Sequence, residues 1–195
     1  MTGGAKAAYC AQNVDIRSVG EEGGSMNKTR IFAAAAAAMS ALLSAQANAQ
    51  TVELVETQGA WGLYADSATP KQVCFIAAQP QSVEPQGANR GPIYFYISAW
   101  PKDGVKAEPS VKVGYPIDAA KDMTVAIGDG TFKLFAKAER GFISDAAEES
   151  KLIEAMKTGT TAIVKATSAR GTETTDTYSL SGLGAALQKM AETCP

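Results

Sequence analysis

The chain has 195 residues, with 18 Lys and Arg, 20 Asp and Glu and no histidine, which gives a formal net charge of −2 at neutral pH. Without histidine the chain has no Ser-His-Asp or Cys-His catalytic group and no histidine zinc site. No basic patch points to nucleic acid, and no phosphate-binding glycine-rich loop precedes a helix.

Residues 26–49 have the three parts of a secretory signal peptide. These parts are, in order, Lys28 and Arg30 in a positive n-region, residues 31–43 in an alanine-rich apolar h-region, and the cleavage site Ala47-Asn48-Ala49 before Gln50. The apolar stretch is shorter than the roughly 20 residues of a membrane-spanning helix, and no second apolar segment of that length follows, so the cleaved product is not expected to span a membrane. The alternative interpretation is an alanine-rich helix of a soluble protein.

The first 25 residues are polar and lack periodicity, and Met26 directly precedes the charged n-region. We therefore expect residues 1–25 to be an over-extended start without structure, although a long n-region is an alternative. Residues 50–195 are expected to form a single extracytoplasmic domain, located in the periplasm, secreted or at the outer envelope surface.

Short alternating segments separated by turn residues predict a series of strands. They are 52–55, 60–64, 72–78, 93–100, 110–117, 123–127, 131–137, 160–169 and 172–180. Within 93–100 the alternation places Tyr94 and Tyr96 on one face and Phe95 and Ile97 on the other. The segment 79–92, with three prolines and two glycines, is expected to be an exposed loop.

Two helices are predicted, at about 145–157 and 181–194. Asp145 and Glu148 have the spacing of a capping box at the start of the first helix. Ser181 is expected to cap the second, whose apolar residues fall at helical spacing. Together these elements predict a mainly β fold, an antiparallel β-sandwich or open barrel with two α-helices.

Two cysteines, Cys74 and Cys194, remain after removal of the signal peptide and of Cys10. An even pair in an oxidising compartment predicts a disulfide that joins the last helix to the first part of the sheet. Two free buried thiols are the alternative.

Charged residues give weak indications of chemistry. Asp118 and Asp122 flank a loop in a way that suits a weak cation site, whereas the adjacent Glu148 and Glu149 point to different sides of a helix. Solvated surface charge is the simpler interpretation of both pairs. We predict no catalytic residue, no metal ligand and no cofactor.

Aromatic residues suggest either a ligand cleft or the core. The residues concerned are Trp61, Tyr64, Tyr94, Tyr96 and Trp100, and the core is the simpler interpretation for most of them. On the exposed loop, Asn89 and Arg90 are candidates for contact with a partner.

Several ordered segments resemble the invasion-associated locus B family. They are Gly62-Leu63-Tyr64, Lys71-Gln72-Val73-Cys74-Phe75, Tyr94-Phe95-Tyr96-Ile97-Ser98, Val113-Gly114-Tyr115-Pro116, Gly159 with its following strand, the run from Arg170 to Leu180, and the last helix up to Cys194. The resemblance covers nearly all of residues 55–194. It implies a small exported protein of the envelope with a mostly β fold and no established catalytic site.

We therefore expect a non-enzymatic periplasmic or surface-associated binding module. Its partner would be an unknown envelope or host protein, or a glycan, with the loop 79–92 as the first candidate contact surface. Two alternatives remain: a periplasmic glycan hydrolase that uses carboxylates alone, and an inhibitor of a hydrolase that acts through one loop.

Overall fold

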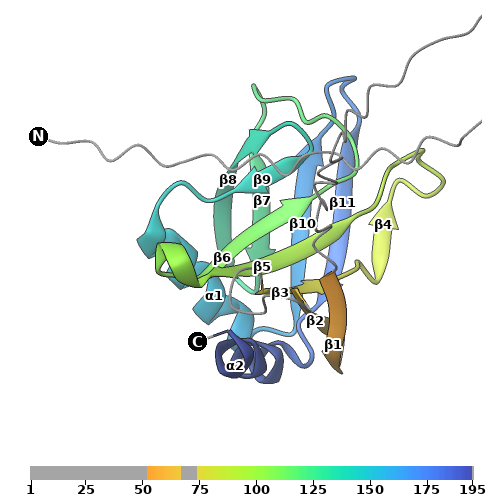
Figure 1. The fold of residues 1–195 in the computed structure, drawn as a ribbon. Coiled ribbons are helices and arrows are strands. Elements are labelled where there is room, and N and C mark those ends of the chain that lie inside the picture. The colour runs from red at the N-terminus through yellow and green to blue at the C-terminus, as the bar shows by residue number, and fades with distance from the viewer. Residues whose placement is uncertain (1–51, 67–73, 195) are drawn as a thin grey trace, which may run out of the picture. The chain divides into compact units, whose positions relative to one another are not determined.

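The computed structural model describes residues 52–66 and 74–194 (Figure 1). The expected over-extended start at 1–25, the signal peptide at 26–49 and its cleavage site lie outside the described residues. The described residues form a mainly β fold with two α-helices, as the sequence predicts. The helices are α1 (Ala146–Thr158) and α2 (Leu183–Thr193).

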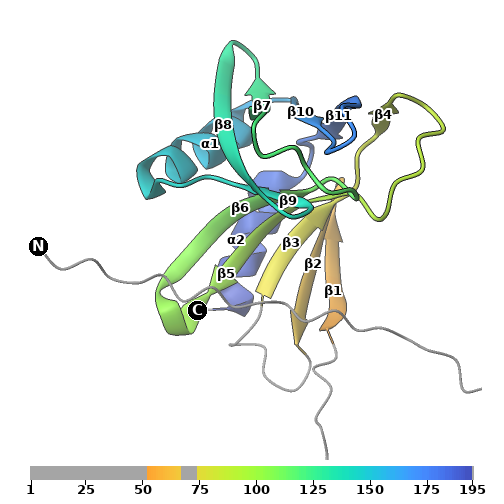
Figure 2. The same ribbon diagram turned by 90° about the horizontal axis from the view of Figure 1, so that it is seen from above.

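The strands form one antiparallel sheet in the order β1-β2-β3-β5-β6-β9-β8-β7-β10-β11-β4. Their bounds are β1 Val52–Gln58, β2 Trp61–Asp66, β3 Cys74–Ala78, β4 Ser82–Glu84, β5 Tyr94–Trp100, β6 Val105–Lys112, β7 Met123–Ile127, β8 Gly130–Lys137, β9 Arg140–Phe142, β10 Thr161–Thr167 and β11 Glu173–Ser179. Figure 2 shows this sheet folded into two layers, with β1, β2, β3, β5 and β6 in one and β7, β10, β11 and β4 in the other. Strands β9 and β8 lead from one layer to the other.

The core lies between the layers and is centred on three fully buried aromatic rings. Trp61 meets Phe95 edge-on at 5.9 Å between ring centroids, and Phe95 meets Tyr178 in the same way at 5.6 Å. The Trp61 indole Nε1 donates a hydrogen bond to the Ser179 carbonyl oxygen at 3.1 Å, which satisfies its buried donor. Trp61 is therefore a core residue that joins β2 to β11.

Helix α1 begins as the sequence predicts. The Asp145 side chain accepts hydrogen bonds from the backbone N–H groups of Ala147 and Glu148, at 2.9 and 3.1 Å. These bonds satisfy two of the donors that a helix start leaves unpaired. The apolar stripe of the helix is buried, and α1 packs against β6 and β8.

The expected Ser181 cap of α2 is wrong. The helix begins at Leu183, and Gly182 occupies the N-cap with a φ of 86°, a conformation that favours glycine. The Ser181 carbonyl oxygen accepts a hydrogen bond from the Ala60 N–H at 3.0 Å, so the turn between β1 and β2 lies against this segment. A Cβ on Gly182 would overlap the Gln58 carbonyl.

The predicted disulfide is present in the structure and joins Cys74 of β3 to Cys194 at the end of α2, with the Cα atoms 6.2 Å apart. Both cysteines are buried, and α2 packs against β2 and β3. Because 120 residues separate the two cysteines, loop closure contributes about 4–5 kcal/mol to stability in the chain-entropy picture.

The remaining differences from the sequence prediction concern three segments. Strand β6 covers Val105–Lys112 rather than 110–117, because at Val113 the chain leaves the ladder and its N–H donates to the Glu139 carbonyl at 3.0 Å. Strand β4 lies inside the expected loop 79–92 and pairs with β11. Strand β9, which pairs with β6 and β8, was not predicted.

None of the helices in the described part of the chain is long and apolar enough to cross a membrane.

Candidate functional site

The predicted carboxylate pairs are already occupied in the structure. Asp118 Oδ1 accepts a hydrogen bond from the Ala120 N–H at 3.0 Å, and Asp122 forms an ion pair with Lys133 at 2.8 Å. Glu148 pairs with Lys151 on the surface of α1. Across residues 52–66 and 74–194, no group of three or more Cys, Asp or Glu side chains is placed to hold a metal ion.

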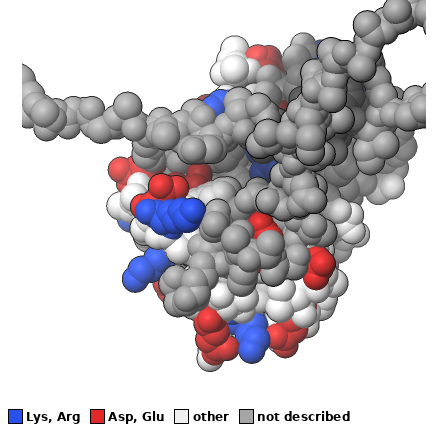
Figure 3. All heavy atoms as spheres, viewed as in Figure 1, with Lys and Arg blue, Asp and Glu red and all other residues white. Residues whose placement is uncertain are grey.

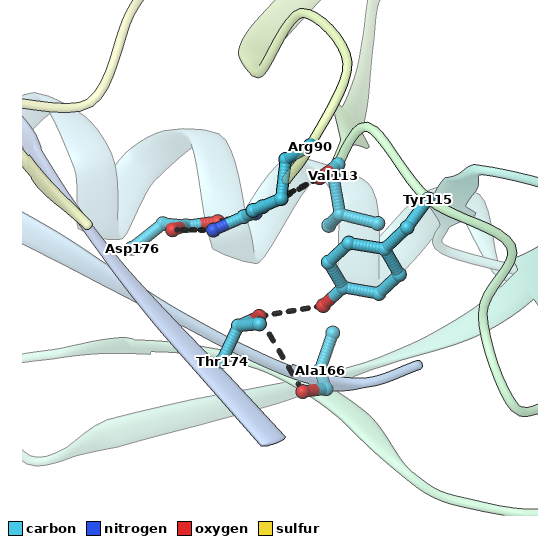
Figure 4. A network of polar contacts seen from close by, with 6 residues as sticks. All are labelled: Arg90, Val113, Tyr115, Ala166, Thr174 and Asp176. Atoms are coloured by element: carbon cyan, nitrogen blue, oxygen red, sulfur yellow. Dashed lines mark hydrogen bonds and ion pairs between the residues drawn. The ribbon is translucent and has the colours of Figure 1, made fainter. Parts of the chain in front are cut away.

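The interpretation of Arg90 as a contact residue is wrong. Its guanidinium donates two hydrogen bonds to Asp176, at 2.7 and 2.6 Å, and two to the Val113 carbonyl oxygen, at 3.0 and 2.9 Å (Figure 4). The Arg90 and Asp176 side chains are 5% and 0% exposed. Bidentate pairing of this kind fixes the orientation of the guanidinium relative to the carboxylate. Arg90 therefore fastens the end of the loop to β11.

Tyr115 and Thr174 extend this network (Figure 4). The guanidinium of Arg90 lies 5.1 Å from the centroid of the Tyr115 ring, and the Tyr115 hydroxyl hydrogen-bonds Thr174 Oγ1. Burial acts to lower the pKa of Arg90, but the hydrogen bonds and charge of Asp176 raise it, so the guanidinium stays charged. Burial raises the pKa of Tyr115. Residues 84–89 beyond this anchor are exposed, as the sequence predicts for the loop.

The outer side of the layer of β1, β2, β3, β5 and β6, together with the adjoining strands β9 and β8, carries a band of aromatic side chains that we name the aromatic face. Its members point away from the core and are Tyr64, Phe75, Tyr94, Tyr96, Phe135 and Phe142. Alternation along β5 explains this placement, because Phe95 and Ile97 fill the core and the residues between them face outward. Most of these rings are half-buried, whereas Phe135 is 49% exposed.

Contacts between strands order the rings. Tyr64 stacks on its cross-strand neighbour Phe75 at 5.2 Å, and Phe75 meets Tyr96 edge-on at 5.7 Å. The Tyr64 ring also lies over Gly62, since a Cβ there would be 3.0 Å from the ring. On β8 and β9, Phe135 stacks on Phe142 at 5.8 Å. The Tyr64 ring thus lies against the sheet, and the ring contacts between strands support the arrangement.

A row of cations borders the aromatic face. In the sheet register Tyr94 is opposite Lys112, Lys112 is opposite Arg140, and Arg140 is opposite Lys137. The Arg140 guanidinium lies 4.8 Å from the centroid of the Tyr96 ring, and Lys112 is 3.7 Å from Glu139. We name Lys112, Lys137 and Arg140 the cation row. Like charges directly opposite one another destabilise a sheet, so this row is unusual.

Charge elsewhere is more evenly mixed. Figure 3 shows Lys and Arg side chains beside Asp and Glu side chains over the visible described surface. The surface lysines of the two helices form close ion pairs: Lys151 with Glu148, Lys157 with Glu154, and Lys189 with Glu192. The cation row differs because its residues have each other as nearest cross-strand neighbours.

The structure therefore divides the five aromatic residues singled out in the sequence. Trp61 belongs to the core, whereas Tyr64, Tyr94 and Tyr96 come together on the aromatic face. Trp100 ends β5, where its Nε1 donates to Glu108 Oε2 at 3.0 Å. Sequence reasoning missed Phe142 and Arg140 because it did not predict β9, although alternation in 131–137 does place Phe135 and Lys137 on one face.

A shallow hollow of about 270 Å³ lies on the other layer, over β7, β10 and β11. Its lining is polar, with Thr124, Lys165 and Thr175 among its residues and two carboxylates, Asp122 and Glu173. The Asp122 side chain is 69% exposed and is the one that pairs with Lys133.

The model of one protein family, described as invasion associated locus B (IalB) protein, matches residues 61–191. The chain belongs to the invasion-associated locus B family. The match runs from β2 into α2 and includes the disulfide residue Cys74, the Arg90 network and the whole aromatic face. The resemblance identified in the sequence is thereby confirmed.

A solved structure supports the family fold. The crystal structure of invasion associated protein B from Bartonella henselae superposes with a TM-score of 0.52 at 18% identity, covering 72% of this chain and 97% of that chain. At this identity the likeness shows a shared IalB fold. Comparison with curated proteins gives no match.

Proposed function

We propose that this IalB-family chain is an exported, non-enzymatic binding module of the cell envelope. It holds an envelope or host macromolecule against its aromatic face. The observation that carries the proposal is the gathering of six aromatic side chains on the outer side of one layer and of the strands β9 and β8 that adjoin it, while the inner side of that layer forms the core. Aromatic side chains dominate binding surfaces because they bury a large area and lose little conformational entropy.

The scaffold beneath the aromatic face is rigid. Cys74, next to Phe75 on β3, is bonded to the end of α2, and Phe95, next to Tyr94 and Tyr96 on β5, packs between Trp61 and Tyr178. Side chains held by a packed core are already in place before a ligand arrives, which lowers the entropic cost of binding.

Export is supported by two independent features. Residues 26–49 have the order of charge, apolar core and small-residue cleavage site of a secretory signal. The disulfide between Cys74 and Cys194 is typical of proteins that mature in an oxidising compartment such as the periplasm or the cell exterior.

Binding is favoured over the alternative of a carboxylate-dependent glycan hydrolase. Such an enzyme needs one carboxylic acid whose pKa is raised by an apolar environment and a second carboxylate nearby. In the hollow over β7, β10 and β11, Asp122 is instead open to solvent and paired with Lys133. That arrangement suits surface charge rather than acid catalysis.

The test is capture of partners from an envelope extract by the purified chain 50–195. We expect capture to be lost in the double variant Tyr64→Ser with Tyr96→Ser. It should persist in Ile163→Ser, a matched control that removes an exposed apolar side chain from the other layer. A third variant replaces residues 85–89 by Gly and Ser. Loss of capture in that loop variant alone would place the contact on the loop and contradict the proposal.

A further inference from the structure

We propose that the ligand of the aromatic face is an acidic glycan, a polysaccharide whose sugar rings carry carboxylate or sulfate groups. The inference rests on the proposed function, because it names the ligand class of the same face. The observation behind it is that the cation row and the aromatic rings are cross-strand neighbours on the same face of the sheet.

The cation row supplies the charge complementarity. Lys112, Arg140 and Lys137 are consecutive cross-strand neighbours on β6, β9 and β8, in a chain whose net charge is −2. Glu139 offsets one of the three positive charges through Lys112, at 3.7 Å. Bound anionic groups would relieve the remaining repulsion, and several cations in a row suit a ligand with repeated negative charges.

The aromatic rings supply the part of the site that recognises sugar. One face of a sugar ring is lined with C–H groups and packs flat on an aromatic ring, and Tyr64 and Tyr96 present such rings together with hydroxyl groups. The Arg140 guanidinium lies over the Tyr96 ring, 4.8 Å from its centroid, and so brings a positive charge that attracts a carboxylate or sulfate to the side of the aromatic rings.

The same geometry disfavours other anionic partners. Insertion into a membrane surface requires apolar side chains that stand out from the protein. Here Tyr64 and Phe75 stack on each other, the Tyr64 ring lies over Gly62 of the sheet, and Phe135, at 49%, is the one exposed ring of this face. A flexible acidic peptide offers charge but no rigid C–H face for the rings.

The experiment measures binding of the chain 50–195 to anionic phospholipid vesicles and to four polymers: polygalacturonate, dextran sulfate, neutral dextran and polyglutamate. We expect polygalacturonate, dextran sulfate or both to bind, with an affinity that falls as salt rises, while neutral dextran and polyglutamate bind at least about tenfold more weakly. Equal binding of polyglutamate, or stronger binding to anionic phospholipid vesicles, would overturn the proposal.

Variants locate the binding. Replacing the cation row by Lys112→Gln, Lys137→Gln and Arg140→Gln should lower affinity about tenfold or more. A matched control, Lys151→Gln with Lys157→Gln and Lys189→Gln, removes the same charge from the helices and should bind like the wild type. Equal weakening in both sets would mean that net charge alone drives binding and would overturn the proposal.

A separate variant isolates the aromatic contribution. Tyr96→Leu keeps an apolar side chain at the face but removes the ring and its hydroxyl, so we expect weaker binding by a chain that still folds, with a small fall in unfolding temperature from the lost ring contacts. An unchanged affinity would refute the stacking role. If Tyr64 and Tyr96 are needed for partner capture but no acidic glycan binds, the ligand class is wrong and the proposed function stands. Capture independent of these residues refutes both.

Discussion

The buried ion pair between Arg90 and Asp176 makes a strong prediction about stability. The substitution Arg90→Ala removes four hydrogen bonds at once, two to Asp176 and two to the Val113 carbonyl oxygen. Asp176 would then be a charged group with no exposed surface and without its partner. The loss should therefore be far larger than that of a surface ion pair.

Removing one partner of a buried pair costs about 3–5 kcal/mol, because the other charge stays buried without compensation. An exposed pair contributes at most about 1 kcal/mol. The chain offers a comparison in Lys133 and Asp122, which are nearly as close at 2.8 Å but are 75% and 69% exposed. Lys133→Ala should therefore cost far less stability than Arg90→Ala.

Urea unfolding of the chain 50–195, followed by tryptophan fluorescence, gives the free energy of unfolding of each variant. The double variant Arg90→Met with Asp176→Leu is also measured, because apolar replacement of both charges avoids the unpaired carboxylate. We expect Arg90→Ala to be the least stable and the double variant to recover part of the loss. Equal small losses in Arg90→Ala and Lys133→Ala would refute the assignment of Arg90 as a buried anchor.

Three further predictions concern the fold. Replacing Cys74 and Cys194 by Ala should lower the free energy of unfolding by about 4–5 kcal/mol under oxidising conditions, and an unchanged urea midpoint would contradict this. Burial raises the pKa of Tyr178, so the native chain keeps a phenolic proton that the unfolded chain releases above about pH 10. Stability should thus fall as pH rises above 10, and Tyr178→Phe should make that fall shallower in urea titrations at pH 9 to 11. Gly182→Ala should destabilise the chain, whereas Gly184→Ala, inside α2 with nothing near its Cβ position, should raise the melting temperature. A Gly182→Ala variant as stable as the wild type would refute the close approach of Gly182 to the turn between β1 and β2.

The sequence predicts those elements whose signals are local. The hairpin of β7 and β8 follows from alternation on both sides of the turn at 128–130, and the start of α1 follows from Asp145. Strand β9 has three residues and forms because it pairs with β6 on one side and β8 on the other. No local stretch of sequence therefore predicts it. The cap of α2 could not be predicted from local sequence either. The Ser181 carbonyl oxygen accepts a hydrogen bond from the N–H of Ala60, which is distant in sequence.

The candidate site is predicted in part for the same reason. Alternation along β5 places Tyr94 and Tyr96 on one face of the strand and Phe95 on the other, but it does not indicate which of the two faces is buried in the core. Arg90 looks like a loop residue with a free charge until Asp176, 86 positions later, is brought against it. The cation row likewise appears once the register joins Lys112 to Arg140 across strands.

The central claim, that the aromatic face is the binding surface, is tested most directly by aromatic side-chain NMR of the chain 50–195 during titration with polygalacturonate. The spectrum contains its own control, because the core rings of Trp61 and Phe95 lie in the same layer as those of Tyr64, Phe75 and Tyr96. We predict that the resonances of Tyr64, Phe75 and Tyr96 shift or broaden while those of the core rings stay in place. Binding of the polymer that leaves the resonances of Tyr64, Phe75 and Tyr96 in place would contradict the claim.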